Sequence, residues 1–244
     1  GPYADRPGYD FIIQAMGGIM DLTGEEEGEP QKPGVAYADL FTGLYSVVAI
    51  QSALLARKET GIGTHVDMSL FDTQLGVLAN QGASYLNTGI SPKRMGNNHP
   101  TIVPYQKFDT RTGPIIIACG NDNQFKNLCI AFGWDFYTDK NYKTNKDRVL
   151  NRQVLTKLMQ DQISPLSKAK ALSTLEASGV PSGSINSVKE ALDDKQTLHR
   201  RMVYEIEGSS AIRTPILFDT LCLKYKYSSP KLGQHTNEIK DKLK

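Results

Sequence analysis

The sequence predicts an α/β protein in which helices dominate the first part of the chain and a small α/β domain follows. Apolar side chains recur at helical spacing through most of residues 10–86. Two runs with strand character then follow a stretch at 87–104 whose glycines, prolines and asparagines are typical of a linker. We therefore expect four parts: a helical segment 1–90, a linker 91–105, a small α/β domain 106–185 and a C-terminal segment 186–244.

The helical segment is expected to contain three helices, at 10–20, 39–61 and 70–86, and a short strand at 65–69. The second helix is the most apolar. Its uncharged run Leu40–Ala56 has 17 residues, fewer than the roughly 20 that a membrane span requires. The run therefore predicts a buried helix and no membrane partner.

The small domain is expected to open with two strands and to continue with helices. The expected strands are Gln106–Asp109 and Pro114–Cys119, and the expected helices are Asn123–Phe132, Lys146–Ile163 and Ser164–Ala177. Further short strands are expected at Val203–Ile206 and Leu221–Tyr225. The basic stretch from Lys140 to Lys157, which includes Arg148, indicates the solvated face of an amphipathic helix, with an anion contact as the alternative.

Composition excludes several classes of function. Twenty-eight basic and 26 acidic residues give a formal charge of +2, so the strong positive field of a dedicated nucleic-acid binder is absent. The three cysteines, Cys119, Cys129 and Cys222, have no C-x-x-C spacing and favour a reducing compartment. We expect a cytoplasmic protein, or a mitochondrial one if the source is eukaryotic. The four histidines have no metal-ligand spacing, and no metal site is expected.

Asp39 is the most interesting carboxylate in the sequence. It lies where an apolar approach, Val35–Ala38, meets the apolar second helix. A carboxylate at a helix N-terminus is held ionised by backbone N–H groups and the helix dipole. Position alone leaves two interpretations open: a simple N-cap, or a carboxylate nucleophile. His99, in a loop, is either a structural histidine or a ligand contact.

Several separate motifs occur in an order that resembles a known family. They are Arg6–Asp10, Gln14–Gly18, Ala38–Gly43, Thr60–Asp67, Arg94–Asn97, Val103–Tyr105, Gly179–Pro181 and Leu232–Thr236. Together they cover nearly the whole chain, which resembles the class III CoA-transferases of the CaiB/BaiF type. The resemblance implies a partial form of that fold: a helical remnant of a Rossmann-like large domain, a small α/β domain, and a C-terminal return to the large domain.

The resemblance also implies a reaction and its residues. The family's catalytic aspartate falls on Asp39, which would form an aspartyl anhydride with the acyl group and then an aspartyl-CoA thioester. Tyr9 and His99 are expected to contact the substrate, and Leu70 to contact coenzyme A; for Tyr9, a role as an aromatic that packs against a helix stays open. Coenzyme A is expected as a substrate, with no permanently bound cofactor.

The implied partners are an acyl-CoA and a small carboxylic acid, and similarity to dicarboxylate-using members suggests a short dicarboxylate. The family forms interlocked homodimers. Its members are longer and begin with a Rossmann-like half, so an upstream N-terminal polypeptide is expected to supply most contacts to coenzyme A.

Two alternatives stay open. The chain could be a truncated, inactive fold remnant or a split-gene subunit that acts only as a binding partner. It could also be an α-methylacyl-CoA racemase, which is similar in fold. The racemases have a histidine immediately before the aspartate that corresponds to Asp10, and this chain has Tyr9 there. Because a racemase needs a base on each side of the α-carbon, this difference favours CoA transfer.

Overall fold

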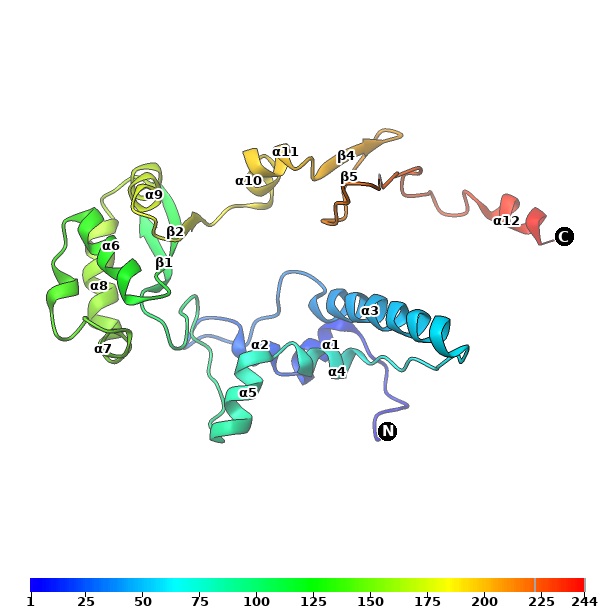
Figure 1. Cartoon of the computed structure of the whole chain (residues 1–244), viewed down its shortest axis with the longest axis horizontal. Coiled ribbons are helices and arrows are strands. Elements are labelled where there is room, and N and C mark those ends of the chain that lie inside the picture. Colours follow the sequence, from blue (N-terminus) through cyan, green and yellow to red (C-terminus); the bar gives the residue numbers. More distant parts are fainter. Residues whose placement is uncertain (222, 244) are drawn as a thin grey trace. The chain divides into compact units, whose positions relative to one another are not determined.

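The computed structural model describes residues 1–221 and 223–243, and the chain divides into two compact units, Gly1–Gly183 and Ser184–Lys244 (Figure 1). The first unit opens with the helices α1 (Asp10–Met16), α2 (Ile19–Leu22), α3 (Tyr37–Thr60), α4 (Leu70–Gly76) and α5 (Ala79–Thr88). Both α1 and α4 pack against α3. Gly61 ends α3 in the left-handed conformation, with φ 72°, and its amide donates to the carbonyl of Arg57. The strand expected at 65–69 is wrong, because this segment is irregular and leads directly into α4.

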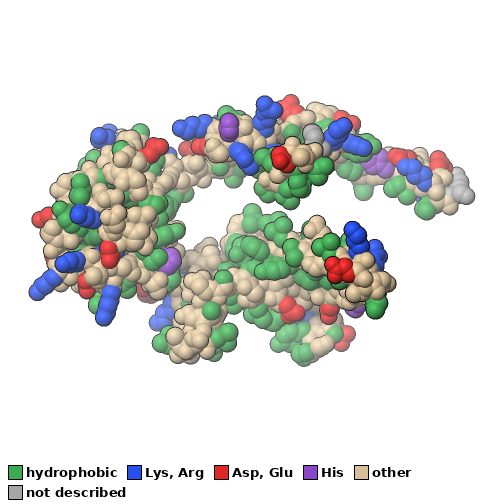
Figure 2. Space-filling view, viewed as in Figure 1, with side chains coloured by type: hydrophobic (Ala, Val, Ile, Leu, Met, Phe, Trp, Pro, Cys, Tyr) green, Lys and Arg blue, Asp and Glu red, His purple; other side chains and the backbone are tan. Residues whose placement is uncertain are grey.

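The prediction that the apolar second helix is buried is also wrong for this chain. Ala38 is the only buried residue of α3, and Leu44 and Leu55 are 63% and 66% exposed. Figure 2 shows apolar side chains over the visible face in the region of α3. The seven-residue helices α1 and α4 span about 10 Å each, whereas α3 spans about 36 Å, so they cover only part of it. Among the described residues, α3 is also long and apolar enough to cross a membrane, as core helices of soluble proteins can be.

The small domain has a layer of helices packed on a three-stranded sheet. Its elements are β1 (Tyr105–Thr110), β2 (Gly113–Ala118), α6 (Asp122–Phe132), the 3-10 turn η1 (Phe136–Thr138), α7 (Asn145–Leu150), α8 (Arg152–Ile163), α9 (Lys168–Ala177) and β3 (Ser182–Ser184). The strand order is β1-β2-β3, and β1 runs antiparallel to β2 with Tyr105 opposite Ala118. Helix α8 packs on β1, and α9 packs on β2 and α6.

One hydrophobic core fills this domain. Its buried members are Val103, Phe108, Ile115, Ile117, Cys119, Phe125, Leu128, Cys129, Tyr142, Leu155, Met159, Ile163, Ala171, Leu175 and Val180. Ile115 and Ile117 alternate along β2 with less buried neighbours, which is the period of a strand with one face on a core. The predicted α/β class is confirmed.

The helix expected over Lys146–Ile163 is two helices, because Asn151 separates α7 from α8. The side-chain amide of Asn151 donates to the carbonyl oxygens of Asn141 at 3.1 Å and Asp147 at 2.9 Å. Its backbone has φ −108° and ψ 23°, away from helical values. Such local side chain to backbone bonding competes with continuation of a helix.

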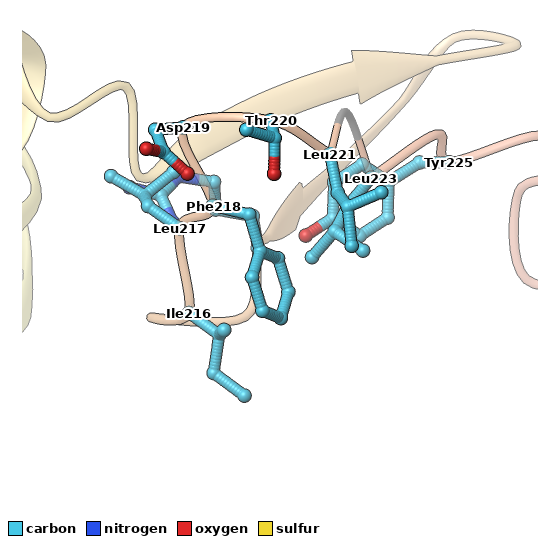
Figure 3. Close-up of a pocket in the computed structure, with 9 residues that line it drawn as sticks. Ile216, Leu217, Phe218, Asp219, Thr220, Leu221, Leu223 and Tyr225 are labelled. Carbon is cyan, nitrogen blue, oxygen red and sulfur yellow. The ribbon is translucent and has the colours of Figure 1, made fainter.

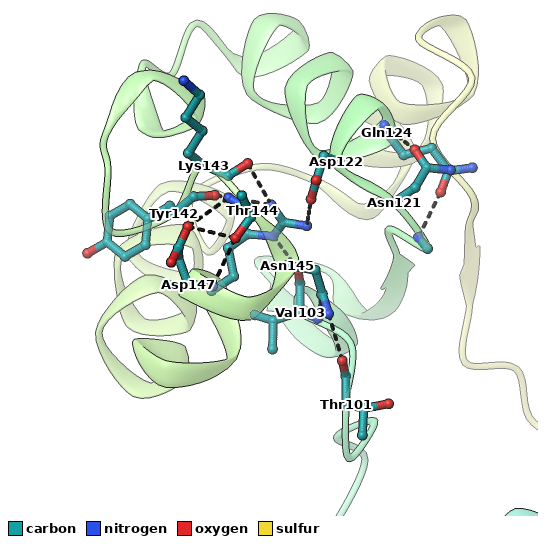
Figure 4. Close-up of polar contacts among 12 residues, drawn as sticks. Thr101, Val103, Asn121, Asp122, Gln124, Tyr142, Lys143, Thr144, Asn145 and Asp147 are labelled. Atoms are coloured by element: carbon teal, nitrogen blue, oxygen red, sulfur yellow. Dashed lines mark hydrogen bonds and ion pairs between the residues drawn. The ribbon is translucent and has the colours of Figure 1, made fainter.

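Arg148 contradicts the prediction that the basic stretch is a solvated face. Its side chain is fully buried and stacks over Phe125, with its guanidinium carbon 4.4 Å from the ring centre. Nε donates to the carbonyl of Val103 at 2.6 Å, Nη1 to that of Tyr142 at 3.1 Å, and Nη2 to Asp122 Oδ1 at 2.7 Å (Figure 4). The guanidinium therefore joins the segment before β1, the loop before α7 and the start of α6.

The second unit holds small elements: α10 (Val188–Leu192), α11 (Lys195–His199), β4 (Val203–Ile206), β5 (Ser209–Ile212) and α12 (Thr236–Lys242). Strands β4 and β5 form a hairpin whose two turn residues, Glu207 and Gly208, have φ of 50° and 76°. Positive φ at both positions matches the twist of the flanking strands. The strand expected at Leu221–Tyr225 is absent from the described residues of that range, and Cys222 lies outside them.

Candidate active site

Asp39 lies in the first turn of α3, three residues after the N-cap position. The N-cap residue is Ala36, whose side chain has no acceptor, and no side chain of the N-cap position bonds to the helix. Asp39 is exposed and is not the N-cap, so the simple capping interpretation is wrong. Its side chain has no hydrogen bond or ion pair among the contacts described, and its carboxylate is open to solvent.

A second carboxylate, from α1, accepts hydrogen bonds from the free backbone N–H groups at the N-terminus, or head, of α3. Oδ1 of Asp10 accepts from the backbone N–H of Ala38 at 2.8 Å and from that of Asp39 at 3.2 Å. Ala38 is fully buried, so water does not replace this acceptor. The interaction fixes the first turn of α3, which carries Asp39, to the first turn of α1.

Gln14 holds Asp10 in place from one turn further along α1. Its Nε2 donates to Asp10 Oδ2 at 2.6 Å and to the carbonyl of Val35 at 3.3 Å. Gln14 is fully buried, and its Oε1 has no hydrogen-bond partner. Gly17, the C-cap residue of α1, lies against Gln74 of α4, and a Cβ added there would lie 2.2 Å from Gln74 Cγ.

Tyr9 is the N-cap residue of α1 and directly precedes Asp10. Tyr9 is 71% exposed. The chain thus brings Tyr9, Asp10 and Asp39 to one end of the α1–α3 pair. Sequence reasoning missed the contacts of Asp10 and Gln14 with the head of α3, because nothing in the local sequence indicates that α1 packs there.

Leu70 lines a cavity of about 590 Å³ between the N-terminal residues, α1 and the start of α4. The other lining residues are Tyr3, Arg6, Pro7, Gly8, Ile12, Ile13, Met16, Met68, Ser69 and Phe71. The cavity is mostly apolar, and Arg6 is its one charged lining residue; its guanidinium lies 4.1 Å from the centre of the Tyr3 ring. It adjoins Tyr9 through Gly8 and shares α1 with Asp10.

His99 lies in the loop before β1, and no described contact joins it to Asp39. Its Nδ1 accepts from the backbone N–H of Thr101 at 3.2 Å, and its ring packs on Tyr105 with 5.0 Å between ring centres. Its carbonyl accepts from Arg152 Nη2 at 2.7 Å. Burial lowers the pKa of Arg152, and the charge of Glu26 opposes that shift.

The loop that carries His99 is tied to the acidic loop after α2. Arg94 forms an ion pair with Asp21 at 2.8 Å, and the amide of Gly96 donates to the carbonyl of Gly24 at 3.0 Å. Gly96 has φ 55°, and a Cβ there would lie 2.9 Å from Oε2 of Glu25. The Glu25 carboxylate ends a flexible side chain that can move aside, so the positive φ is the stronger reason for glycine at position 96.

Other candidate chemistry is absent from the part of the chain that the structure describes. Cys119 and Cys129 are buried free thiols, and desolvation raises the pKa of each to about 12, so they are not nucleophiles at neutral pH. No group of three or more metal-ligating side chains occurs among the described residues.

The second unit has a cavity of its own, of about 360 Å³, in the irregular segment after β5. In the view of Figure 3, Phe218 lies between Leu217 on one side and Leu221 and Tyr225 on the other. Arg213 also lines it, but its guanidinium is already bonded to the carbonyls of Arg200 and Arg201. Asp219 and Thr220 also add polar groups to a lining that is otherwise apolar or aromatic.

The site and fold together define a class: an α/β protein with an exposed carboxylate at the head of a long helix that another carboxylate caps. The chain matches CoA-transferase family III over residues 1–236 and belongs to that family. It is 43% identical to the succinate–glutarate CoA-transferase of Agrobacterium fabrum, over 98% of this chain and 61% of that protein. It is 38% identical to the succinyl-CoA:glutarate CoA-transferase of Mus musculus, over 98% of this chain and 56% of that protein.

A solved structure shows the same fold. The crystal structure of a CAIB/BAIF family protein from Brucella suis is 51% identical and superposes with a TM-score of 0.88, over 100% of this chain and 65% of that chain. The chain thus spans 56–61% of the length of the two curated relatives. The predicted family is confirmed.

Proposed function

We propose that the protein containing this chain transfers coenzyme A from an acyl-CoA to a short dicarboxylic acid, with Asp39 as the nucleophile. The observation that carries the proposal is the arrangement at the head of α3. Asp10 accepts hydrogen bonds from the backbone amides of Ala38 and Asp39, and the Asp39 carboxylate is exposed and has no described hydrogen bond of its own. A carboxylate is a weak nucleophile, so its orientation must supply much of the rate.

The proposed reaction has four steps that balance in charge and atoms. A carboxylate oxygen of Asp39 attacks the thioester carbonyl of the donor, and the C–S bond breaks to give an aspartyl anhydride and coenzyme A thiolate. The thiolate attacks the Asp39 carbonyl and releases the donor acid, leaving an aspartyl-CoA thioester. The acceptor carboxylate then attacks this thioester and displaces the thiolate. Finally, the thiolate attacks the acceptor's carbonyl, which forms the new acyl-CoA and frees Asp39.

The other predicted site residues have proposed roles around this centre. The apolar cavity lined by Leu70 suits the acyl chain or the uncharged arm of coenzyme A, and Arg6 at its wall suits an anionic group. The exposed hydroxyl of Tyr9 could donate to a substrate carboxylate, since it adjoins Asp10. His99 is proposed as a substrate contact on the resemblance alone.

The acceptor class is inferred from the relatives. Both curated relatives described above are named for transfer between succinate or succinyl-CoA and glutarate, which are dicarboxylates. We extend that class, and the homodimer of the family, to this protein as proposals.

Trapping the acyl-enzyme tests the nucleophile. The full-length polypeptide that carries this chain is mixed with succinyl-CoA, glutarate and hydroxylamine, and its peptides are then analysed by mass spectrometry. Hydroxylamine should convert Asp39 into a hydroxamate, and Asp39→Asn should abolish both the mark and the transfer of coenzyme A. Asp72→Asn, which changes another acid in a helix first turn, should leave both unchanged. A hydroxamate at any other carboxylate would contradict the proposal.

A further inference from the structure

We infer that Asp10 is a positioning residue for Asp39: its carboxylate caps α3 so that the Asp39 carboxylate stays free to react. The inference rests on the proposed function and deepens it by naming the group that holds the nucleophile. The N-terminus of α3 is unusual in how it is capped. A helix is usually capped by the side chain of its own N-cap residue, which accepts from the second or third amide of the helix. Here that residue is Ala36, which cannot accept.

Asp10 accepts from the same two amides that an N-cap side chain would. Its Oδ1 lies 2.8 Å from the nitrogen of Ala38, the second residue of α3, and 3.2 Å from that of Asp39, the third. The cap comes from another helix, 28 residues earlier in the chain. Since one of the two bonds is made to the backbone of Asp39 itself, the position of Asp10 directly sets the position of the nucleophile's main chain.

The arrangement also keeps the Asp39 side chain from capping its own helix. An acid at the third position of a helix commonly bonds back to the N-cap amide, as Asp147 does to Thr144 in α7 and Glu190 does to Ser187 in α10. Asp39 occupies that position in α3, yet it forms no such bond. A carboxylate held in a capping box would have its lone pairs occupied, and the external cap from Asp10 makes that use unnecessary.

Gln14 makes the cap rigid and supplies a sharp test. Its Nε2 donates to the second oxygen of Asp10 at 2.6 Å and to the carbonyl of Val35, the residue before Ala36, at 3.3 Å. Its Oε1 is buried without a partner. If an asparagine replaced Asp10, rotation of the Gln14 amide by half a turn would present Oε1 to the new side-chain amide and would give up only the longer bond from Nε2 to the carbonyl of Val35. The substitution Asp10→Asn can therefore keep the cap, whereas Asp10→Ala removes it.

The experiment measures steady-state CoA transfer by the full-length polypeptide with varied succinyl-CoA and glutarate. Asp10→Ala should lower kcat about 10- to 100-fold, as expected when a reacting group is displaced, with each KM changed by less than about threefold. Asp10→Asn should restore kcat to within about fivefold of the wild-type value, because asparagine and aspartate cap helices equally well. The matched control is Asn121→Ala, which removes the side-chain cap of α6 in the small domain, a 2.9 Å bond to Gln124. It should lower the melting temperature but leave kcat unchanged.

Three results would overturn the inference: a wild-type kcat in Asp10→Ala, an equal loss of kcat in Asn121→Ala, or an Asp10→Asn variant as slow as Asp10→Ala. Failure of the proposed function has a different signature, because Asp39→Ala would then retain turnover. A protein in which Asp39→Ala is inactive and Asp10→Ala is fully active keeps the proposed nucleophile and rejects the positioning role.

Discussion

Replacing Arg148 by methionine should destabilise the small domain more than removing the acid that pairs with it. Methionine fills much of the same space but leaves the carbonyl oxygens of Val103 and Tyr142 without donors. Both residues are buried, at 0% and 7% exposure, so water cannot substitute. Two such acceptors at about 1–3 kcal/mol each give an expected loss of about 2–6 kcal/mol. This is a large part of the roughly 5–15 kcal/mol that stabilises a typical domain.

Removing Asp122 should cost less. The Asp122 side chain is 54% exposed but the Arg148 side chain is fully buried, so the loss of their ion pair should cost about 1–2 kcal/mol, more than an exposed pair and less than a fully buried one. In Asp122→Ala the guanidinium also keeps its bonds to the carbonyls of Val103 and Tyr142. Comparing the two variants therefore separates the contribution of the hydrogen bonds to the carbonyls from that of the ion pair to the free energy of unfolding.

Urea unfolding followed by tryptophan fluorescence measures both changes. The chain has one tryptophan, Trp134, whose ring stacks on Phe132 with 4.8 Å between ring centres, inside the same domain. With a slope of about 2 kcal/mol per molar urea, Arg148→Met should lower the midpoint by about 1–3 M and Asp122→Ala by about 0.5–1 M. Equal midpoints for the two variants would refute the reasoning.

Three further predictions concern other parts of the chain. Gly17→Ala should loosen the packing of α1 on α4 and lower the melting temperature by several degrees, because the Cβ of the new alanine would lie 2.2 Å from Gln74 Cγ. The control is Gly76→Ala, which should not have this steric effect because no atom of another element lies within 4 Å of a Cβ at position 76. Cys119 and Cys129 should resist a thiol reagent at pH 8 until the domain unfolds, and rapid labelling of the folded protein would contradict this. Since burial raises the pKa of each thiol from 9.0 to about 12, the contribution of the buried thiols to stability is fully present below pH 9 and is lost as the pH rises towards 12. Incubation of the full-length polypeptide with an α-methylacyl-CoA in deuterated water should give no hydrogen exchange at the α-carbon, because Tyr9 stands where a racemase has its histidine base. Rapid deuteration, detected by mass spectrometry, would favour the racemase alternative.

Local features of this protein could be predicted from its sequence. Each end of the strands β1 and β2 lies within one residue of the predicted range, because alternation and turn residues act between neighbours in the chain. The end of α3 at Gly61 follows from the left-handed conformation that glycine adopts readily. The place of Asp39 at the start of an apolar helix was likewise visible, and its proposed role as nucleophile stays a prediction.

Other features depended on which segments the fold brings together. The sequence by itself determined that α3 is apolar and that the stretch from Lys140 to Lys157 is basic. Only the tertiary structure decided that α3 leaves most of its apolar side chains exposed in this chain and that Arg148 is buried. Periodicity specifies which side chains share a face of a helix, but it does not specify what lies opposite that face. The capping of α3 by Asp10 is of the same kind, because a bond between residues 28 positions apart forms only when packing places α1 beside the head of α3.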